Sequence, residues 1–241
     1  MADRSTDLGG PRKDFPRTTA KFLAQLRNPG TQARAAVMEM LAERYWKPVY
    51  HFLRLAYGKG NEDAKDLTQA FFAWLLEREL LLKFDPARSS FRTFLKGILR
   101  NFAGNEHQAL QRLKRGGGVK VLPLDAGGAD LEGIGREESD PEKLFDAVFL
   151  KAAIERAVER VRARFRAGRK IVPFLAFQEV HLSKSPEPPT YAEVAKRLGV
   201  KESDVRNYLH EVREAVRGEL KAEFAGDGGE MPGEVSSLFK G

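Results

Sequence analysis

Basic side chains recur at four-residue steps within residues 91–120, where seven Lys or Arg residues accompany a single acid, Glu106. Residues four apart lie on one face of a helix, so Arg92, Lys96 and Arg100 form a straight cationic row. Asn and His side chains follow the row, and this combination suits contacts with phosphates and hydrogen bonds to base edges. A merely solubilising surface is the weaker interpretation because the charge is so one-sided. The residues predicted to bind nucleic acid here are Arg92, Lys96, Arg100, Asn101, Asn105 and His107.

A second candidate for nucleic-acid contact is TYAEVAKRLGVKESDVRNYLHEVREAVR, residues 190–217. Thr190 and Glu193 form a capping box at the start of a short helix that ends at Gly199. A tight turn follows, in which Val200 points inward, and a longer helix begins after it. This layout is typical of a helix-turn-helix, although a plain helical hairpin is the alternative. The exposed residues predicted near the second helix are Lys201, Ser203, Arg206, Asn207, Tyr208, His210 and Arg213.

An acidic-edged amphipathic helix precedes the cationic row, at about residues 62–82. Ala64, Leu67 and Phe71 recur at helical spacing and predict a buried face. The other side carries Asp63, Asp66, Gln69 and Glu77. Composition alone favours a solvated acidic face. Between this helix and the row, Pro86 restricts the residue before it to extended geometry, so residues 83–90 are predicted to form a loop.

The bulk composition limits the classes of function. The formal net charge is +7 and the pI is near 9.6, which favours a polyanionic partner. The absence of cysteine excludes disulfides and thiolate metal sites, and the four histidines lack the spacing of metal ligands. No apolar run approaches the roughly 20 residues of a membrane span, and the N-terminus has no signal-peptide core. We therefore expect a cytoplasmic protein that is not an enzyme, with no catalytic site, no metal, no cofactor and no membrane partner.

Helical periodicity is interrupted by a Gly-rich and acidic segment, and this interruption divides the chain. We predict an all-α protein with two small helical domains joined by a flexible acidic linker. The linker is either a disordered solubilising segment or a mimic of nucleic acid that lies in a basic channel of a partner. The predicted segments are a flexible lead-in at 1–18, a first domain at 19–115, the linker at 116–141, a second domain at 142–224 and a flexible tail at 225–241.

The ordered set of motifs resembles bacterial RNA polymerase sigma factors of the extracytoplasmic-function (ECF) group, over about residues 20–222. DAKDLTQAFFAWLLE resembles the helix with which region 2 of this family binds the polymerase clamp. FDPARSSFRTFLKGILRNFAGNE resembles the part that opens the promoter and recognises its −10 element. YAEVAKRLGVKESDVRNYLHEVREAVR resembles the helix-turn-helix of region 4. The resemblance thus implies a region 2 helical bundle and a region 4 helix-turn-helix. It implies core RNA polymerase and promoter DNA as partners, and it leaves open whether an anti-sigma factor is a further partner.

The resemblance also implies roles for individual residues. The acidic side of the first helix would contact the clamp through Asp63, Asp66, Gln69 and Glu77. The loop that captures a flipped base of the −10 element would contain Arg88, Ser89 and Ser90. The −10 strand and its upstream duplex would contact Arg92, Lys96, Arg100, Asn101, Asn105 and His107. The −35 element would be recognised by Thr190, Lys201, Ser203, Arg206, Asn207, Tyr208, His210 and Arg213. The acidic linker would occupy the RNA exit path.

Four positions depart from the family pattern. Ala70 stands where many relatives carry a glutamate, and Lys201 stands where a serine usually caps the recognition helix. Asp204 and Glu211 bring negative charge close to DNA phosphates, although Asp204 also suits a helix N-terminus. Two other functions stay open: a helix-turn-helix regulator that acts without polymerase, and a polymerase-binding adaptor or decoy whose DNA contacts have decayed.

Overall fold

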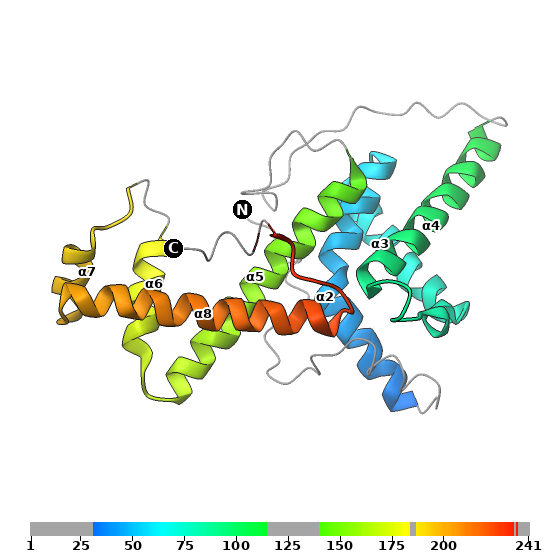
Figure 1. Ribbon diagram of the computed structural model, residues 1–241. Coiled ribbons are helices and arrows are strands. Elements are labelled where there is room, and N and C mark those ends of the chain that lie inside the picture. The colour runs from blue at the N-terminus through cyan, green and yellow to red at the C-terminus, as the bar shows by residue number, and fades with distance from the viewer. Residues whose placement is uncertain (1–30, 115–139, 184–186, 234, 236–241) are drawn as a thin grey trace. The chain divides into compact units, whose positions relative to one another are not determined.

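A computed structural model describes residues 31–114, 140–183, 187–233 and 235, with side chains from residue 35 onward except at 105–114. Every regular element in these residues is a helix, which confirms the predicted all-α class (Figure 1). The helices are α2 (Thr31–Tyr57), α3 (Asn61–Glu77), the short 3-10 helix η3 (Leu80–Lys83), α4 (Phe91–Lys114), α5 (Pro141–Ala167), α6 (Ile171–His181), α7 (Tyr191–Leu198) and α8 (Glu202–Gly226). The predicted lead-in and nearly all of the predicted linker lie outside the described residues.

The chain divides into two compact units, and the division falls inside α5. The described part of the first unit comprises residues 31–114, 140–152 and 226–229. The second comprises 153–183, 187–225, 230–233 and 235. The predicted second domain begins at residue 142, whereas here about three turns of α5 belong to the first unit. Residues 226–229, the last residue of α8 and the three after it, also belong to the first unit. They lie in the segment predicted to be a flexible tail.

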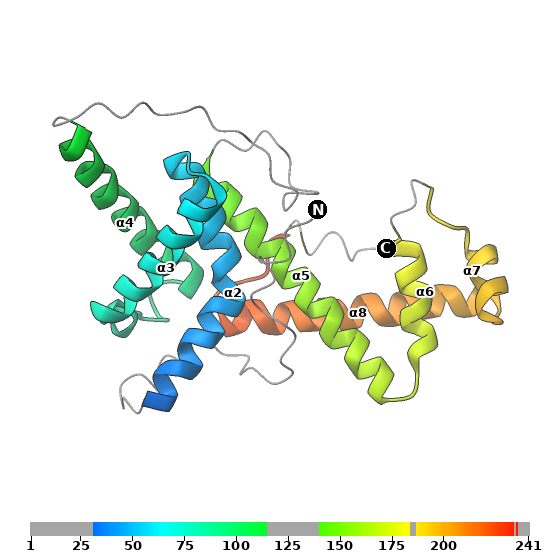
Figure 2. The same cartoon turned by 180° about the vertical axis from the view of Figure 1, so that it is seen from behind.

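Aromatic side chains hold the core of the first unit together, where α2, α3 and α4 lie side by side (Figure 2). The ring of Tyr45 in α2 meets Phe91 of α4 edge-on, with 5.3 Å between ring centroids, and stacks on Phe149 of α5 at 5.4 Å. Phe71 of α3 meets Phe102 of α4 at 5.3 Å. Each such pair adds about 0.5–1.5 kcal/mol beyond the burial of its area. The start of α5 is therefore part of this core.

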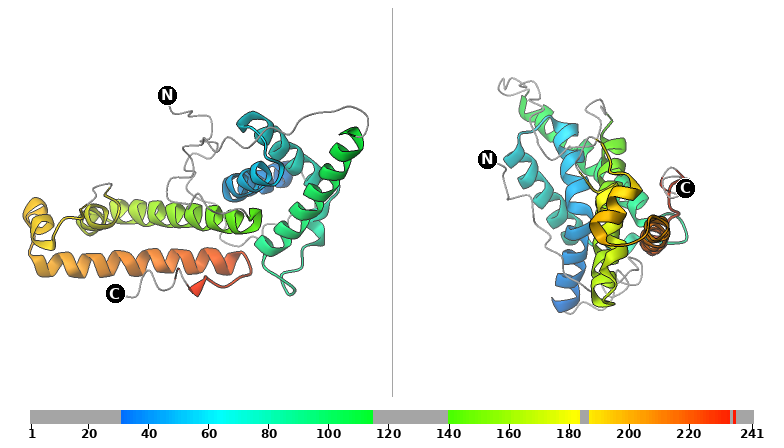
Figure 3. Two further views of the ribbon diagram at one scale, coloured as in Figure 1. Left: turned by 90° about the horizontal axis from the view of Figure 1, so that it is seen from above. Right: turned by 90° about the vertical axis from the view of Figure 1, so that its left-hand side faces the viewer.

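In the second unit, α5 and α8 lie side by side (Figure 3), and ion pairs join them. Glu223 is 2% exposed and accepts from Arg156 at 2.6 and 3.0 Å, and it also pairs with Arg160. Arg160 Nε lies 3.3 Å from Glu219 Oε2. Later residues of α5 meet earlier residues of α8, so the two segments run antiparallel. Burying these carboxylates is tolerated because each has an opposite charge beside it, and Glu223 also accepts hydrogen bonds.

Candidate nucleic-acid and partner interfaces

The predicted helix-turn-helix is built by α7, a turn at Gly199 and α8. Thr190 Oγ1 accepts from Glu193 N at 3.3 Å, and Thr190 N donates to the Glu193 carboxylate at 2.8 Å, so the predicted capping box is present. Thr190 N and then Thr190 Oγ1, which both donate to the Glu193 carboxylate, lower the pKa of Glu193 because they favour its ionised form. Gly199 ends α7 with φ of 67°, a left-handed conformation that glycine adopts without a steric penalty. The local chemistry of the sequence thus determines where α7 begins and ends.

The start of α8 is stabilised by a residue of its own first turn. Lys201 N donates to Asp204 Oδ2 at 3.1 Å, so Asp204 satisfies the N–H group of the residue that precedes the helix. A carboxylate in the first turn also interacts favourably with the positive end of the helix dipole. Asp204 is therefore a structural residue of this helix, and its negative charge is partly neutralised by the helix terminus.

The first turns of α8 present a polar face to solvent, named here the α8 face. Its exposed members are Lys201, Ser203, Arg206, Asn207 and His210. Tyr208 and Arg213 are half-buried, and Thr190 is exposed at the start of α7. Arg206 pairs with Glu202 at 3.0 Å, with 68% of its side chain exposed. Because an exposed pair of this kind contributes little, Arg206 can exchange Glu202 for another anion.

Arg213 has a partner outside α8. Its Nη2 lies 3.1 Å from His181 Nε2 at the end of α6. Burial, and then the positive charge of Arg213, lower the pKa of His181, which keeps the imidazole neutral and able to accept from the guanidinium. Arg213 therefore lies at the edge of the α8 face and not among its freely exposed members.

The predicted partner-binding side of α3 is exposed. Its four members are all in solvent: Asp63, Asp66, Gln69 and Glu77. Asp63 pairs with Lys59 at 3.8 Å while 67% of its side chain stays exposed. At 100° per residue, Asp63, Asp66 and Glu77 fall within about 60° of one another on the helix. Ala70 lies in the same stripe and is also exposed, so the departure from the family pattern occupies the middle of this surface.

The loop before α4 is organised by Asp85. Its side chain accepts from Ala87 N at 3.0 Å, and its carbonyl accepts from Arg88 N at 3.1 Å. Arg88 lies 3.2 Å from the Asp85 carboxylate, with 86% of its side chain exposed. Ser89 and Ser90 are half-buried at the end of the loop. The loop is thus a hydrogen-bonded turn that presents Arg88 outward.

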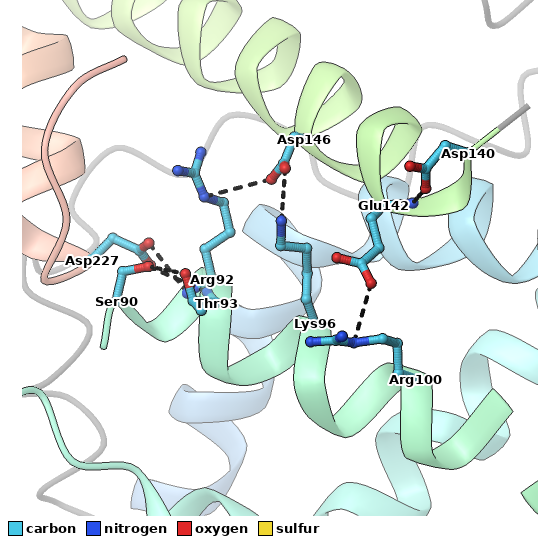
Figure 4. A network of polar contacts seen from close by, with 9 residues as sticks. All are labelled: Ser90, Arg92, Thr93, Lys96, Arg100, Asp140, Glu142, Asp146 and Asp227. Carbon is cyan, nitrogen blue, oxygen red and sulfur yellow. Dashed lines mark hydrogen bonds and ion pairs between the residues drawn. The ribbon is translucent and has the colours of Figure 1, made fainter. Parts of the chain in front are cut away.

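The cationic row lies on one face of α4 as predicted, but this face is occupied by α5 (Figure 4). Lys96 Nζ lies 2.7 Å from Asp146 Oδ2, and its side chain is 16% exposed. Arg92 Nε lies 3.7 Å from Asp146 Oδ1, and its side chain is 19% exposed. Arg92 also stands 5.2 Å from the centre of the Phe149 ring. The sequence predicted that these cations bind nucleic acid. In the structure, Arg92 and Lys96 instead lie beside Asp146 of α5, and Arg92 also lies beside Phe149.

The last member of the row is different. Arg100 Nε lies 3.1 Å from Glu142 Oε1, but 60% of the arginine side chain is exposed. Asn101, the next residue, is exposed as well. The predicted contacts Asn105 and His107 belong to α4 but their side chains lie outside the described residues. Arg100 and Asn101 are therefore the accessible described part of this predicted surface.

Asp227 is the polar residue that sequence reasoning missed most completely. It is 2% exposed, and the Tyr45 hydroxyl donates to its carboxylate. Burial raises the pKa of Asp227 to about 6, although the hydrogen bonds from Tyr45 and Arg92 and the charges of Arg92 and Arg44 act against the rise. Its Gly-rich surroundings, GDGG, suggested a loose tail, and no periodic pattern marks a single buried aspartate. The opening of the predicted tail is thus folded into the first unit.

Two further properties concern cofactors and membranes. In the described part of the chain, no group of three or more His, Asp or Glu side chains is placed to hold a metal ion. None of the described helices is long and apolar enough to cross a membrane.

Comparison with known proteins adds one relative. The chain is similar to the ECF RNA polymerase sigma factor SigE of Mycolicibacterium smegmatis (strain ATCC 700084 / mc(2)155), with 27% identity over 206 residues. The aligned region covers 85% of this chain and 68% of the relative. This match confirms the resemblance predicted from the motifs. The chain thus resembles an ECF sigma factor in sequence. No family model and no solved structure matches it.

The motifs that resemble ECF sigma factors lie on separate units of the structure. The clamp-like and −10-like motifs lie on α3, the Asp85 loop and α4 of the first unit. The helix-turn-helix lies on α7 and α8 of the second unit. The roles of individual residues stay predictions at this point.

Proposed function

We propose that this chain is an ECF-type sigma factor that binds core RNA polymerase and directs transcription initiation at promoters with −35 and −10 elements. The polymerase performs the chemistry, and the chain itself is not an enzyme. The first unit supplies the region 2 role and the second unit the region 4 role. Core RNA polymerase and promoter DNA are the partners, and the site of action is the cytoplasm.

The observation that carries the proposal is the exposed α8 face together with the exposed acidic stripe of α3. The α8 face has donors and acceptors that suit base edges and phosphates in a major groove. The stripe suits a basic protein surface, because opposite potentials guide association and orient partners. Similarity to a protein named as an RNA polymerase sigma factor favours assigning both surfaces to one function.

The residue roles divide between three surfaces. Polymerase contact falls to Asp63, Asp66, Gln69 and Glu77. Capture and holding of the −10 strand fall to the exposed Arg88, Arg100 and Asn101 and to the half-buried Ser89 and Ser90, with Asn105 and His107. Recognition of the −35 element falls to the α8 face with Thr190, Tyr208 and Arg213. Arg92 and Lys96 contribute to the −10 surface chiefly by positioning α4, because acidic and aromatic groups of α5 surround them.

The test is transcription in vitro from fragmented genomic DNA, with core polymerase alone and with the purified chain added. We expect discrete transcripts that depend on the chain, and start-site mapping then defines the promoter elements. The matched variants are Arg206→Ala on the α8 face and Arg162→Ala, a half-buried arginine of α5 outside all three surfaces. The first variant should lose transcripts and the second should keep them. If the complete chain with core polymerase yields no specific transcript, the proposal fails.

A second function is favoured by one observation. All three cations of the row pair with acids of α5, and two of them are mostly buried, which suits a helix-turn-helix regulator that binds duplex DNA through α8 without polymerase. A gel shift on the mapped fragment separates the two functions. A regulator binds with nanomolar affinity when polymerase is absent, whereas the sigma factor needs polymerase to bind.

A further inference from the structure

Residues 226–229, at the end of α8 and just after it, supply the missing hydrogen-bond partners at the start of α4. Phe91 N donates to the Asp227 carbonyl at 2.8 Å, and Arg92 N donates to Asp227 Oδ2 at 3.3 Å (Figure 4). The first N–H groups of a helix have no partner within the helix, so an outside acceptor is needed when they are buried. Asp227 fills that need from 135 residues further along the chain.

The remaining N–H groups of the first turn are satisfied by the loop itself. Thr93 N donates to Ser90 Oγ at 3.2 Å, and Phe94 N donates to the Ser90 carbonyl at 3.0 Å. Ser90 is therefore the local cap of α4, and Asp227 is the remote one. The two together account for the first four N–H groups of the helix. A carboxylate at this end also interacts favourably with the helix dipole.

The turn after Asp227 lies directly against the loop. Gly228 has φ of 76°, and a Cβ added to it would lie 3.7 Å from Ser90 Cα and 3.8 Å from the Ser89 carbonyl oxygen. Asp227 is in turn fixed by the hydroxyl of Tyr45, whose ring is stacked on Phe149 in the core. A chain of contacts thus runs from the core, through Asp227, to the backbone of Ser89 and Ser90.

We propose that Asp227 is a positioning residue for the loop Arg88–Ser90, holding it in the geometry that receives an extruded promoter base. This inference rests on the proposed function. A loop that accepts a flipped base must offset the cost of unstacking it, and a loop already held in its binding geometry loses less entropy in doing so. Asp227 touches no nucleotide in this role and acts through the backbone of the loop and of the first turn of α4.

The experiment uses full-length protein with core polymerase and a forked promoter DNA, in which one −10 base at a time is replaced by an abasic site. The base that enters the loop is the one whose removal weakens binding most, by roughly tenfold. Asp227→Ala removes the two carboxylate oxygens that accept from the Tyr45 hydroxyl and from Arg92 N. The ratio of the affinities for intact and abasic DNA should then fall to nearly one. Asp227→Asn keeps the size and one acceptor, so it should fold where the alanine variant does not and show an intermediate penalty.

A matched control separates positioning from general loss of stability. Thr68→Val removes a buried hydroxyl that donates to Ala64 within α3, away from the loop, and it should keep the full abasic penalty. Hydrogen exchange of the free protein should rise at residues 89–93 in both Asp227 variants and not in Thr68→Val.

The outcomes distinguish a loop that captures no base from a loop that captures a base without help from Asp227. If wild-type holoenzyme shows no abasic penalty at any position, the base-capturing function of the loop fails and the positioning role falls with it. If wild type shows the penalty and a folded Asp227 variant keeps it in full, only the positioning role is overturned. A reduced penalty accompanied by faster exchange at residues 89–93 supports the role.

Discussion

The starts of α4 and α8 carry similar basic and polar side chains, yet their surroundings are opposite. On α4, Arg92 and Lys96 are less than one-fifth exposed and both pair with Asp146. On α8, Arg206 is 68% exposed and pairs with Glu202 on its own helix. The difference lies in what packs against each helix: α4 meets the acidic and aromatic start of α5, whereas the polar side of α8 faces solvent. A row of cations therefore predicts a helix face but not whether that face is accessible.

The largest expected effect concerns the claim that α5 is part of the core around α4. Phe149→Ala should destabilise the first unit by about 3–5 kcal/mol, because it removes a buried ring that stacks on Tyr45 and lies beside Arg92. The two tryptophans, Trp46 and Trp74, both belong to the first unit, so their fluorescence during denaturation by urea reports it. Leu175→Ala, at an exposed position of α6, should change the same transition by about 0.5 kcal/mol or less. A small effect of Phe149→Ala would place α5 outside the core.

The next effect concerns the buried cap at the start of α4 and has a defined pH dependence. The pKa of Asp227 rises from 3.8 to about 6 on folding, so the folded state holds its proton more tightly than the unfolded state. The stabilising contribution of that proton is complete below about pH 4 and is lost as the pH rises to about 6, a change of about 3 kcal/mol. The charged and titratable groups that face it are Tyr45 and Arg44 from α2 and Arg92 from α4.

This dependence is measured as the difference in unfolding free energy between wild type and Asp227→Asn, from pH 4 to pH 7. The variant has no titrating group at this position, so all other groups cancel in the difference. The unfolding free energy of wild type minus that of Asp227→Asn should fall as the pH rises from 4, and it should stay constant above about pH 6.5. A flat difference throughout would show that burial does not perturb this carboxyl.

A third effect tests the two helix starts directly against each other. Arg206→Ala should weaken promoter binding by the holoenzyme by about 1–3 kcal/mol and leave the unfolding of the first unit unchanged. Arg92→Ala should instead destabilise the first unit, because it removes the ion pair with Asp146 and the contact with the Phe149 ring. Binding to the mapped promoter and tryptophan fluorescence are measured on both proteins. If both variants lost promoter binding equally and neither lost stability, Arg92 would be as accessible to DNA as Arg206, which contradicts the expected difference between α4 and α8.

The smallest effect concerns the accessible end of the cationic row. Glu142→Gln should release Arg100 for DNA phosphates, so the affinity for promoter DNA should rise about two- to fivefold, since an exposed ion pair is worth up to about 1 kcal/mol. The slope of log affinity against log salt should steepen by up to about 0.9, the value for one additional phosphate contact. Glu159→Gln on the same helix, which releases Arg162 instead, is the control and should change neither quantity. An unchanged slope in Glu142→Gln would mean that Arg100 does not meet DNA.

Much of the fold was predictable because its signals are local. The capping box of Thr190 and Glu193 joins residues three apart, and the left-handed Gly199 ends the same short helix. The apolar stripe of α8 predicts which of its sides is buried and which carries Arg206 and Asn207. Such features need only the residues within one helical turn, so a single sequence specifies them. The ordered motifs also predicted the similarity to ECF sigma factors that the comparison confirmed.

The surroundings of the candidate site were not predictable in the same way. Lys96 meets Asp146 from 50 residues away, and Tyr45 meets Asp227 from 182 residues away. Neither acid belongs to a motif, and one lies in a Gly-rich segment that predicts a loose tail. Sequence alone determined the helices, their caps and the residue types on each face. Only the tertiary structure decided which cations stay accessible and what holds the loop before α4, because charge pairing and burial depend on segments that fold together from distant parts of the chain.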